Sequence, residues 1–594
     1  MENVKKGPAR FPPQGVGKSD SAQESMPLAE ISRKARQRVR EMERKRLYYE
    51  TRWKSIRDYQ LPYIGIFDGE DDESARAKRR DQHIYHGCAW QSNQIFAAGV
   101  MSGLTPPSRR WFRLAFGNAE LADNSNVGKL LDQRIDIMND VLEKSNFYTA
   151  VHSCYLELAY GQAPMAIFPD SRYGVHFEPY TVGTYALEAG PDGDITRFCR
   201  RYRMTAQQLA DKFGADCLPE HVRNELSNGT GISQSHKVVW YVAPNKNYRQ
   251  GRLGRQYLPY LSLYYLEDSA PGEYLYAGGF YEFPVVVARY QITGNEAYGK
   301  GPGWFAEGDS KGLQLLEKDM LTAIELSVKP PMVTTAENMN KGINLVPGGK
   351  TFAQQTDSVK PLFQVQTNIQ ALQEKIVDLE GRIKRAYSAD LFLMLDQMED
   401  KSMTAREVME RTQEKMQQLG PVVQRMQFEF LGRIIERVYN ILDRAGVFPA
   451  PEDEELTQTL AREEIKIEYI SPLAQAQKMG GLVNIEQAIS FIFQLAQADQ
   501  GILAKVDFNE AVNRYFEMVG APSAIKRTDD EYKEIIQQQE AARQAQQEAQ
   551  AAQMVQMAAP AAQAAKNATE AAANGNPALQ QLMGMDGMGA PQNL

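Results

Sequence analysis

Two glycine-rich stretches place lysine beside residue types that bind phosphate. Residues 294–300, Gly-Asn-Glu-Ala-Tyr-Gly-Lys, have the spacing of a Walker A loop, in which backbone N–H groups surround phosphates and the lysine contacts them. Position 301 is glycine where serine or threonine must contact Mg²⁺, and the Pro-Gly pair after it interrupts the helix whose N-terminus should face the phosphates. In residues 348–351, Gly-Gly-Lys-Thr, the nearest upstream glycine, Gly342, is one residue too distant. Neither stretch therefore predicts a nucleotide site, and the second is typical of a hairpin turn.

Histidine and cysteine side chains are the other candidates for chemistry. Among the six histidines, at positions 83, 86, 152, 176, 221 and 236, only His83 and His86 lie close together, three residues apart on a predicted helix. A ligand role there needs a cysteine or carboxylate partner nearby, so packing is the preferred interpretation. The cysteines form no C-x-x-C pair, which is typical of reduced structural thiols: Cys88, Cys154, Cys199 and Cys217. With no H-E-x-x-H or G-x-S-x-G motif either, we expect no catalytic residues, no cofactor and no metal.

Length and charge narrow the class of protein. A chain of 594 residues predicts several domains, and 43% hydrophobic residues are enough for a sizeable core. No window reaches the ~18 consecutive apolar residues of a membrane span, and the N-terminus lacks a signal-peptide pattern, so we expect a soluble protein made in the cytoplasm and without a membrane partner. With 67 basic and 75 acidic residues the net charge is −8. This charge argues against holding nucleic acid by bulk electrostatics, but not against letting DNA slide past.

The elements that would position these residues begin with a long basic helix. Residues 1–28, rich in proline, predict a disordered arm, and residues 31–59 predict the helix. Its charges indicate a solvated face or, alternatively, contact with phosphate or an acidic partner. A second helix is predicted at 83–101, followed by a group of arginines and aromatic residues at 109–113 that is compatible with packing or with recognition.

An α+β body follows from the next pattern change. Residues 126–160 predict two helices, and 205–213 predict a short capped helix. Alternating apolar residues and tyrosines predict strands at 165–168, 175–177, 185–187, 195–202, 238–242, 257–266, 273–276 and 284–290. The first half of the chain is therefore predicted to be an α+β fold.

A helical projection is predicted after this body. A helix at 309–328 leads into short strands and glycine-rich turns at 332–365, and a return helix begins at a capping box formed by Thr367 and Gln370. The return helix carries a heptad seam that should pack on a neighbouring helix: Ile369, Leu372, Ile376, Leu379, Ile383 and Ala386. An apolar and acidic loop is predicted at 390–403, and we expect it to need a shared surface or a lumen.

The last third begins with another helix. A capping box of Thr404 and Glu407 opens it, the Gly-Pro pair at 420–421 should kink it, and Gly446 should end it. Its apolar face consists of Val423, Met426, Phe430, Ile434, Val438 and Ile441. A strand at 465–470 and three helices at 471–518 are predicted next, and the last ~40 residues have too few bulky side chains to pack.

This order of parts resembles the portal, or head-to-tail connector, proteins of short-tailed double-stranded-DNA phages. The resemblance covers roughly residues 30–520. It is carried by the basic helix, by Gly-Leu-Thr-Pro-Pro-Ser-Arg-Arg-Trp-Phe at 103–112, by Tyr-Gly-Lys-Gly-Pro-Gly at 298–303 with its following helix and Lys-Pro-Pro, and by the capped helix at 404. It implies a dodecameric ring at one capsid vertex, through which DNA is packaged and ejected, and which docks the terminase large subunit and then the tail.

The resemblance also assigns a role to each segment. The arm at 1–28 precedes a wing at 29–307, stem helices at 308–329 and 366–388 flank a clip at 330–365, and a tunnel loop lies at 389–403. The wing closes at 404–470, a helical crown occupies 471–550, and a flexible tail occupies 551–594. The implied partners are the homo-dodecamer, double-stranded DNA read without sequence specificity, the terminase large subunit, tail adaptors, and the major capsid and scaffolding proteins. The implied location is the portal vertex of the virion.

Individual residues follow from those roles. The tunnel loop residues that would face DNA are Leu393, Met394, Leu395, Asp396, Met398, Glu399, Asp400 and Lys401. Stem packing would involve Ile369, Leu372, Ile376, Leu379 and Ile383, and clip docking would involve Lys341, Lys350 and Lys360. A channel wall with few cations should let DNA slide, because each phosphate contact adds affinity that movement must break. Lys401, the one basic residue of the loop, would grip or steer the duplex.

Two other classes remain open at this point. A non-catalytic capsid or scaffolding protein would also be large and soluble, although scaffolds are usually helical and polar throughout. A nucleotide-driven packaging ATPase would need a working phosphate loop, which neither glycine-rich stretch supplies.

Overall fold

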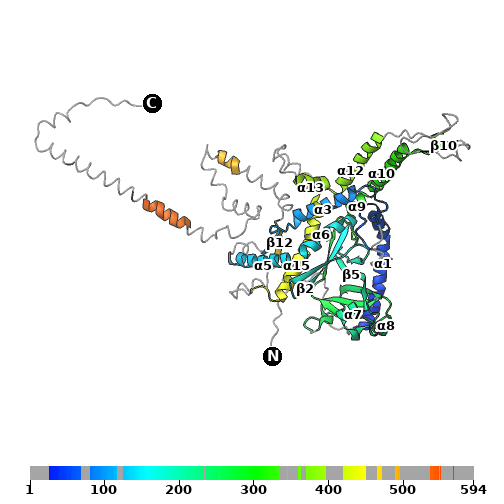
Figure 1. The fold of residues 1–594 in the computed structure, drawn as a ribbon. Coiled ribbons are helices and arrows are strands. Elements are labelled where there is room, and N and C mark those ends of the chain that lie inside the picture. Colours follow the sequence, from blue (N-terminus) through cyan, green and yellow to red (C-terminus); the bar gives the residue numbers. More distant parts are fainter. Residues whose placement is uncertain are drawn as a thin grey trace, which may run out of the picture. The chain divides into compact units, whose positions relative to one another are not determined.

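The computed structural model describes residues 26–67, 80–116, 125–232, 234–252, 254–334, 344, 359–362, 369–396, 419–449, 465–470, 489–495, 535–546, 549 and 566. The chain divides into two compact units, Met1–Ala122 with Val127–Ala521, and Asp123–Asn126 with Pro522–Leu594. In the second unit, residues 535–546 form a helix. The sheets and the helices that pack on them belong to the first unit (Figure 1). Most of the predicted arm, crown and tail lies outside the described residues.

The predicted basic helix is confirmed as α1, Leu28–Tyr59. One face packs on the five-stranded sheet, where Val39 is buried. Arginines are buried on this face too: Arg36 donates to the Ser269 hydroxyl at 2.6 Å, and Arg46 donates to the Gly183 carbonyl at 2.8 Å. The opposite face is exposed and carries Arg33, Lys34, Arg40, Arg44 and Lys45. Part of the basic charge therefore fixes α1 to the body, while the rest faces solvent.

Two antiparallel sheets form the β part of the body, which confirms the predicted α+β class. The larger has the order β4-β5-β6-β7-β8, with β4 Tyr185–Ala189, β5 Ile195–Thr205, β6 Ser235–Pro244, β7 Tyr260–Leu266 and β8 Tyr276–Phe280. The smaller has the order β3-β2-β9, with β3 Gly174–Pro179, β2 Gln162–Asp170 and β9 Val285–Arg289. Trp240 on β6 lies opposite Arg200 and Tyr264, and its ring stacks on that of Tyr264 at 5.7 Å.

The strand predicted at 273–276 is wrong, because strand β8 begins only at Tyr276. The segment before it is a turn in which Gly272 has a φ of +111°, a conformation that favours glycine. The Glu273 carbonyl accepts hydrogen bonds from Ser32 at 3.0 Å and from Arg36 at 3.1 Å, both on α1. These residues therefore dock the helix instead of extending the strand.

Helices cover the smaller sheet and build the main core. They are α3 Cys88–Leu104, α5 Ser125–Lys144, α6 Phe147–Glu157 and the 3-10 turn η1 Leu158–Tyr160. A smaller layer carries α7 Ala206–Phe213, η2 Ala215–Cys217 and α8 Glu220–Ser227, whereas η3 Arg255–Tyr257 contacts β8. The predicted cap of the helix at Thr205 is confirmed, and it is a capping box with Gln208. Among the described residues, no helix has a stretch long and apolar enough for a bilayer.

The aromatic residues of the group at 109–113 pack in the core. Trp111 and Phe112 are fully buried, and Trp111 stacks on Phe147 at 6.0 Å, while Arg110 is exposed and pairs with Asp136. Strand β1, Phe112–Phe116, pairs antiparallel with β12, Ile465–Tyr469. The predicted closing strand is thereby confirmed, and it returns the chain to its first third.

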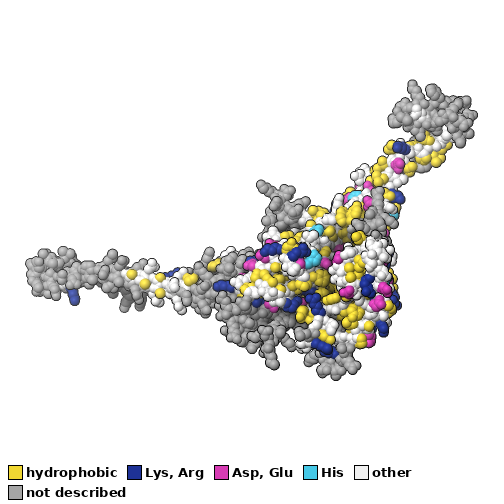
Figure 2. Space-filling model, turned by 60° about the horizontal axis from the view of Figure 1, so that its bottom comes forward, with side chains coloured by type: hydrophobic (Ala, Val, Ile, Leu, Met, Phe, Trp, Pro, Cys, Tyr) yellow, Lys and Arg dark blue, Asp and Glu magenta, His cyan; other side chains and the backbone are white. Residues whose placement is uncertain are grey.

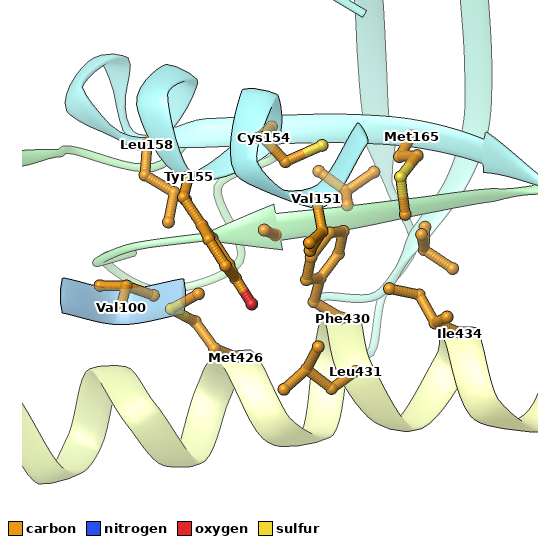
Figure 3. Packing of buried hydrophobic residues seen from close by; sticks show 14 of the residues in the cluster. Val100, Val151, Cys154, Tyr155, Leu158, Met165, Met426, Phe430, Leu431 and Ile434 are labelled. Atoms are coloured by element: carbon orange, nitrogen blue, oxygen red, sulfur yellow. The ribbon is translucent and has the colours of Figure 1, made fainter. Parts of the chain in front are cut away.

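The helix after residue 404 is described from Leu419 onward. Residues 419–425 are α-helical, Met426–Leu431 form the π-helix η6, and α15 covers Gly432–Arg444. Every residue of its predicted apolar face is buried, and Figure 3 shows Phe430 and Met426 directed toward Tyr155 of α6. The predicted stop is confirmed, since Gly446 has a φ of +68°. The capping box at 404–407 lies outside the described residues.

The remaining elements form the projection, precede it (α9) or follow it (α13). They are α9 Pro302–Phe305, α10 Glu307–Val328, β10 Met332–Thr334, β11 Val359–Pro361, α12 Ile369–Ala386 and α13 Ala389–Asp396. Figure 1 shows α10 and α12 side by side, leading from the body toward β10.

Candidate functional site

The base of the α10–α12 pair is fixed by buried polar side chains. Glu307, at the start of α10, accepts hydrogen bonds from Ser55 at 2.7 Å and from Lys311 at 2.8 Å, and it pairs with Arg52. Burial alone would raise the pKa of the Glu307 carboxyl, but these hydrogen bonds and the Arg52 charge hold its pKa below the usual value. The contacts join α1 to α10 where the projection leaves the body.

A second anchor lies about two turns further along α10. The buried Gln314 side chain accepts from the backbone N–H groups of Tyr85 at 2.6 Å and His86 at 2.8 Å, and it donates to the His86 carbonyl at 2.8 Å. These bonds hold residues 84–87 in a non-helical conformation, so α3 starts at Cys88 and the helix start predicted at His83 is wrong.

The end of α12 is tied to the same base. Tyr387 is fully buried, and its hydroxyl donates to the Gln60 side-chain oxygen at 2.7 Å. Gln60 in turn donates to the Gly303 carbonyl at 2.9 Å. Residues after α1, within α9 and after α12 are therefore held together by two hydrogen bonds.

The predicted stem-packing residues divide into two groups. Ile376, Leu379 and Ile383 are buried within the chain's own core, where α12 packs against α3 and α10. Leu372 is half-buried and Ile369 is 40% exposed. The half of α12 nearest the body is therefore buried within the subunit, and the seam residues of the far half are more exposed.

Apolar side chains are exposed along the outer part of the projection. On α10, Leu321 is 49% exposed and Val328 is 71% exposed, and on α12, Val377 is 62% exposed. Figure 2 shows hydrophobic side chains gathered on this arm. Exposed apolar side chains gathered in this way are typical of a protein–protein interface.

Only part of the predicted clip is described. Strands β10 and β11 pair antiparallel, with Val333 opposite Lys360, and Lys360 is exposed. Lys341 and Lys350 lie outside the described residues. The ladder confirms that the chain leaves α10 and returns to α12 through a β module.

The predicted tunnel loop starts differently from expectation. Residues 389–396 form helix α13 rather than a loop, because Ser388, with a φ of 54°, ends α12 and lets a new helix begin at once. Leu391 and Phe392 are buried in the chain's own core, so the apolar start of this segment needs no lumen. Phe392 lies over Gly99 of α3, where a Cβ would come within 2.1 Å of the ring.

The other tunnel residues are placed as follows. Leu393 is 38% exposed, and Met394, Leu395 and Asp396 complete α13. Met398, Glu399, Asp400 and Lys401 lie outside the described residues.

The first phosphate-loop candidate is a packing element. A Cβ built on Gly301 would lie 2.1 Å from the Leu158 carbonyl oxygen, and one on Gly299 would lie 2.2 Å from that of Gly161, so backbone occupies the space that a phosphate would need. The expected interruption of a helix by the Pro-Gly pair is wrong, since Pro302 opens the helical turn α9, where its missing N–H is no loss. The second candidate, at 348–351, lies outside the described residues.

The histidines are arranged differently from the sequence-based expectation. His86 pairs with Glu380 at 3.0 Å and His83 stacks on Tyr59 at 5.5 Å, so that pair shares no site. Instead, His221 and His236 converge with Asp268, with one ligand atom of each within 4.8 Å of the others. The predicted strands around 238–242 and 257–266 held the signal, because their antiparallel pairing places His236 beside Asp268.

Comparison with known proteins identifies the family. The chain matches the family model described as "Bacteriophage head to tail connecting protein" over residues 32–526. The chain belongs to this family. The extent of the match agrees with the resemblance found in the sequence, and the connector assignment is therefore confirmed.

Two relatives of this connector are named as portal proteins. It is 32% identical over 510 residues to the "Portal protein" of Salmonella phage epsilon15, covering 85% of this chain and 90% of that protein. It is 30% identical over 501 residues to the "Probable portal protein" of Bordetella phage BPP-1, covering 83% and 89%. A solved structure titled "Virion of native gene transfer agent (GTA) particle" matches at 9% identity with a TM-score of 0.29, over 68% of this chain and 86% of that one, and this likeness is too small to argue from.

Proposed function

We propose that this connector is a portal protein, and that copies of it form a dodecameric ring at one vertex of the capsid. Double-stranded DNA would enter and leave through the central channel. The terminase large subunit would dock on the ring during packaging and tail adaptors would dock afterwards, while major capsid and scaffolding proteins would surround it. Family membership supports the connector role, and the subunit number rests on the resemblance alone.

The exposed apolar side chains of the stem are the observation that supports the proposed ring. On an isolated subunit Leu321, Val328 and Val377 are exposed to water. Burying their apolar surface would stabilise the ring by ~25 cal/mol per Å². In a ring, each α10–α12 pair would lie against the pair of the next subunit, and a repeated head-to-tail contact closes with no free apolar face. The seam residues nearest the body would then pack inside the subunit, and the exposed apolar residues would pack between subunits.

The segment roles follow from this arrangement. The wing would comprise residues 29–307 and 404–470, the stem 308–329 and 366–388, and the clip 330–365, with a crown at 471–550. Because α13 is docked on the body through Phe392, the part of the tunnel segment left for the channel is residues 397–403, which include Met398 and Lys401.

Charge would set how DNA moves through this channel. Asp400 and Glu399 would repel the duplex, Met398 would give a deformable constriction, and Lys401 would supply the one cationic contact per subunit. We expect Lys401→Glu to change DNA retention while the ring still assembles. Lys144→Glu, on the exposed surface of α5, is the matched charge change and should leave retention as it is. Loss of the ring in Lys401→Glu would contradict the tunnel assignment.

We also propose that the protein itself is not an enzyme, and that the terminase supplies the energy of packaging. The backbone contacts of Gly299 and Gly301 support this, because they fill the only Walker-like loop among the described residues. Purified protein should show no ATP turnover with or without DNA. Turnover that is lost in Lys300→Ala would overturn this part of the proposal.

Imaging with a mass determination on the same sample tests the proposal directly. A ring of dodecamer mass, with a central hole wide enough for a DNA duplex, is the expected result. A monomer, or a closed particle without a channel, would overturn it and favour a scaffolding role.

A further inference from the structure

Four titratable side chains meet at the end of the five-stranded sheet where β6 begins and β7 ends. His221 and Glu225 lie four residues apart on α8, so they face the same side of this helix. His236 is the second residue of β6, and Asp268 follows β7 after one intervening residue. The antiparallel register of these two strands places His236 beside Asp268.

The two ring nitrogens of His236 have different neighbours. Its Nε2 lies 2.8 Å from the Glu225 carboxylate, which fixes the proton on that nitrogen, and its Nδ1 lies 4.0 Å from the Asp268 carboxylate. His221 Nε2 lies 3.5 Å from the same Asp268 oxygen. Metal-binding histidines characteristically donate their second N–H to a carboxylate in this way, which leaves the other nitrogen free to coordinate.

The cluster combines a rigid inner side with an open outer side. The His236 side chain is 10% exposed and that of Glu225 is 17% exposed, whereas those of His221 and Asp268 are 49% and 56% exposed. Between the two α8 residues, Val222 is fully buried in a small apolar cluster, and this fixes the rotation of the helix. The outer side gives an ion a path from solvent.

We propose that this cluster is a binding site for a divalent transition-metal ion, with Zn²⁺ as the ion it suits best. His221 Nε2, His236 Nδ1 and the Asp268 carboxylate are the ligands, a water molecule takes the fourth position, and Glu225 orients His236. Two imidazoles and one carboxylate are a donor set that tetrahedral zinc accepts. Bound metal would join α8 to the β6–β7 end and stabilise the small layer of the wing.

Two of the three ligand distances are close to those of a tetrahedral site, and the third needs a larger change, because the ring nitrogens of His221 and His236 lie within 4.8 Å of each other and must approach by up to about 1.4 Å. Ligand atoms around tetrahedral zinc lie about 3.4 Å apart, given bonds of ~2.0–2.2 Å. The 3.5 Å between His221 and Asp268 already matches this spacing. The 4.0 Å between His236 and Asp268 must shorten by roughly half an ångström, which a rotation of the exposed Asp268 side chain accommodates.

Zinc titration of the untagged, full-length protein after chelator treatment tests the site. Isothermal titration calorimetry should show one ion per chain, and Co²⁺ should give the visible absorption bands of a tetrahedral site. The exposed ligand variants His221→Ala and Asp268→Asn should each lower zinc affinity at least tenfold. Glu225→Gln should lower affinity ~10–100-fold while tetrahedral Co²⁺ bands persist at saturation, since this side chain only orients a ligand.

His176→Ala is the matched control, because this exposed histidine lies outside the cluster, and it should bind zinc as the parent protein does. Circular dichroism of each variant tests whether the fold is kept. His221 and Asp268 are both exposed, so substituting them should not unfold the protein. Unchanged zinc stoichiometry and affinity in both His221→Ala and Asp268→Asn would overturn the proposal, as would the lack of tetrahedral Co²⁺ bands in the parent protein. In either case the four side chains are an ion-pair cluster only.

Discussion

Phe392 is the residue that fixes α13 to the body. It is 6% exposed, lies over Gly99 and meets the Phe96 ring edge-on at 6.1 Å. Phe392→Ala removes this contact and leaves a cavity, which should cost ~3–5 kcal/mol in the free energy of docking this helix. Hydrogen exchange over residues 389–396 should accelerate by orders of magnitude. Leu393→Ala, on the exposed side of the same helix, is the control, and equal exchange in the two variants would contradict docking through Phe392.

Glu157 gives the body a pH-dependent stability. Burial raises the pKa of its carboxyl to about 7, although Thr181 and the Val182 N–H both donate to it. The folded protein therefore keeps a proton that the unfolded chain releases above about pH 4.5, so this residue's contribution is full below that pH and is lost as pH rises toward 7.

Glu157→Gln should reduce that dependence. The amide carries no charge, and the Thr181 hydroxyl can accept from it, so the variant should be more stable than the parent at pH 8 by up to about 3 kcal/mol. Burial raises the pKa of Glu436 to about 7 as well, so some of the slope should remain in the single variant and disappear in the double variant with Glu436→Gln. Urea denaturation at pH 5 and pH 8 measures this. An unchanged slope in the double variant would show that neither carboxyl is responsible.

At the scale of elements, the π-helix η6 depends on a neighbour. In a π-turn the backbone hydrogen bond spans five residues, and here the Gly432 N–H donates to the Gln427 carbonyl. The Tyr469 hydroxyl of β12 donates to the same carbonyl at 2.6 Å. The wider turn brings Glu429 within 2.8 Å of the buried Arg289, which an α-helical register would rotate away.

Tyr469→Phe should lower the local stability of η6 without unfolding the body. One hydrogen bond is lost, so the cost should be ~1 kcal/mol, and protection against hydrogen exchange should fall most at residues 426–432. Tyr439→Phe is the comparison variant, because it removes a tyrosine hydroxyl from α15, which continues η6, but outside the π-helical residues. Equal losses of protection at 426–432 in the two variants would contradict a role for the β12 hydroxyl.

Elements that follow from the spacing of apolar side chains could be predicted from the sequence. Element boundaries that depend on a contact with a residue distant in the sequence could not. The apolar residues from Val423 to Ile441 repeat at helical spacing, so both the helix and its buried face could be predicted from the sequence. The start of α3 did not, because it depends on the Gln314 side chain more than 200 residues away. Nor did the π-turn, since η6 uses the same apolar spacing as an α-helix and differs only through Tyr469 and Arg289.

The site was predictable to a similar degree. The β module between two long helices followed from turn residues and helical period. The start of α13 was missed because a serine in the left-handed region, Ser388, has no sequence signal as strong as glycine. The His221–His236 cluster was missed because ligand spacing was sought along the chain and not across the paired strands.

At the scale of the whole molecule, the stem should determine assembly. Leu321→Ser with Val328→Ser removes apolar area from the exposed part of α10, while the buried base at Leu313 is untouched. The folded subunit should keep its circular dichroism and thermal midpoint at the monomer level, and ring formation should require at least tenfold more protein. Mass photometry across a dilution series measures this.

The control for that experiment is Ile232→Ser, which changes a 77% exposed apolar residue between α8 and β6. It should assemble as the parent does. If the stem variant assembles at parental concentrations, the outer face of α10 is not the contact between subunits.

The pairing of β1 with β12 has a consequence for how each subunit is made. Phe112 pairs with Tyr469, so one strand is synthesised long before its partner. At ~5–20 residues per second, β12 leaves the ribosome roughly 20–70 s after β1. Throughout that interval the edge of β1 has no partner and can pair with another nascent chain. Slower growth at low temperature with chaperones present should therefore raise the soluble yield, and a chain whose translation has not yet passed β12 lacks this pairing.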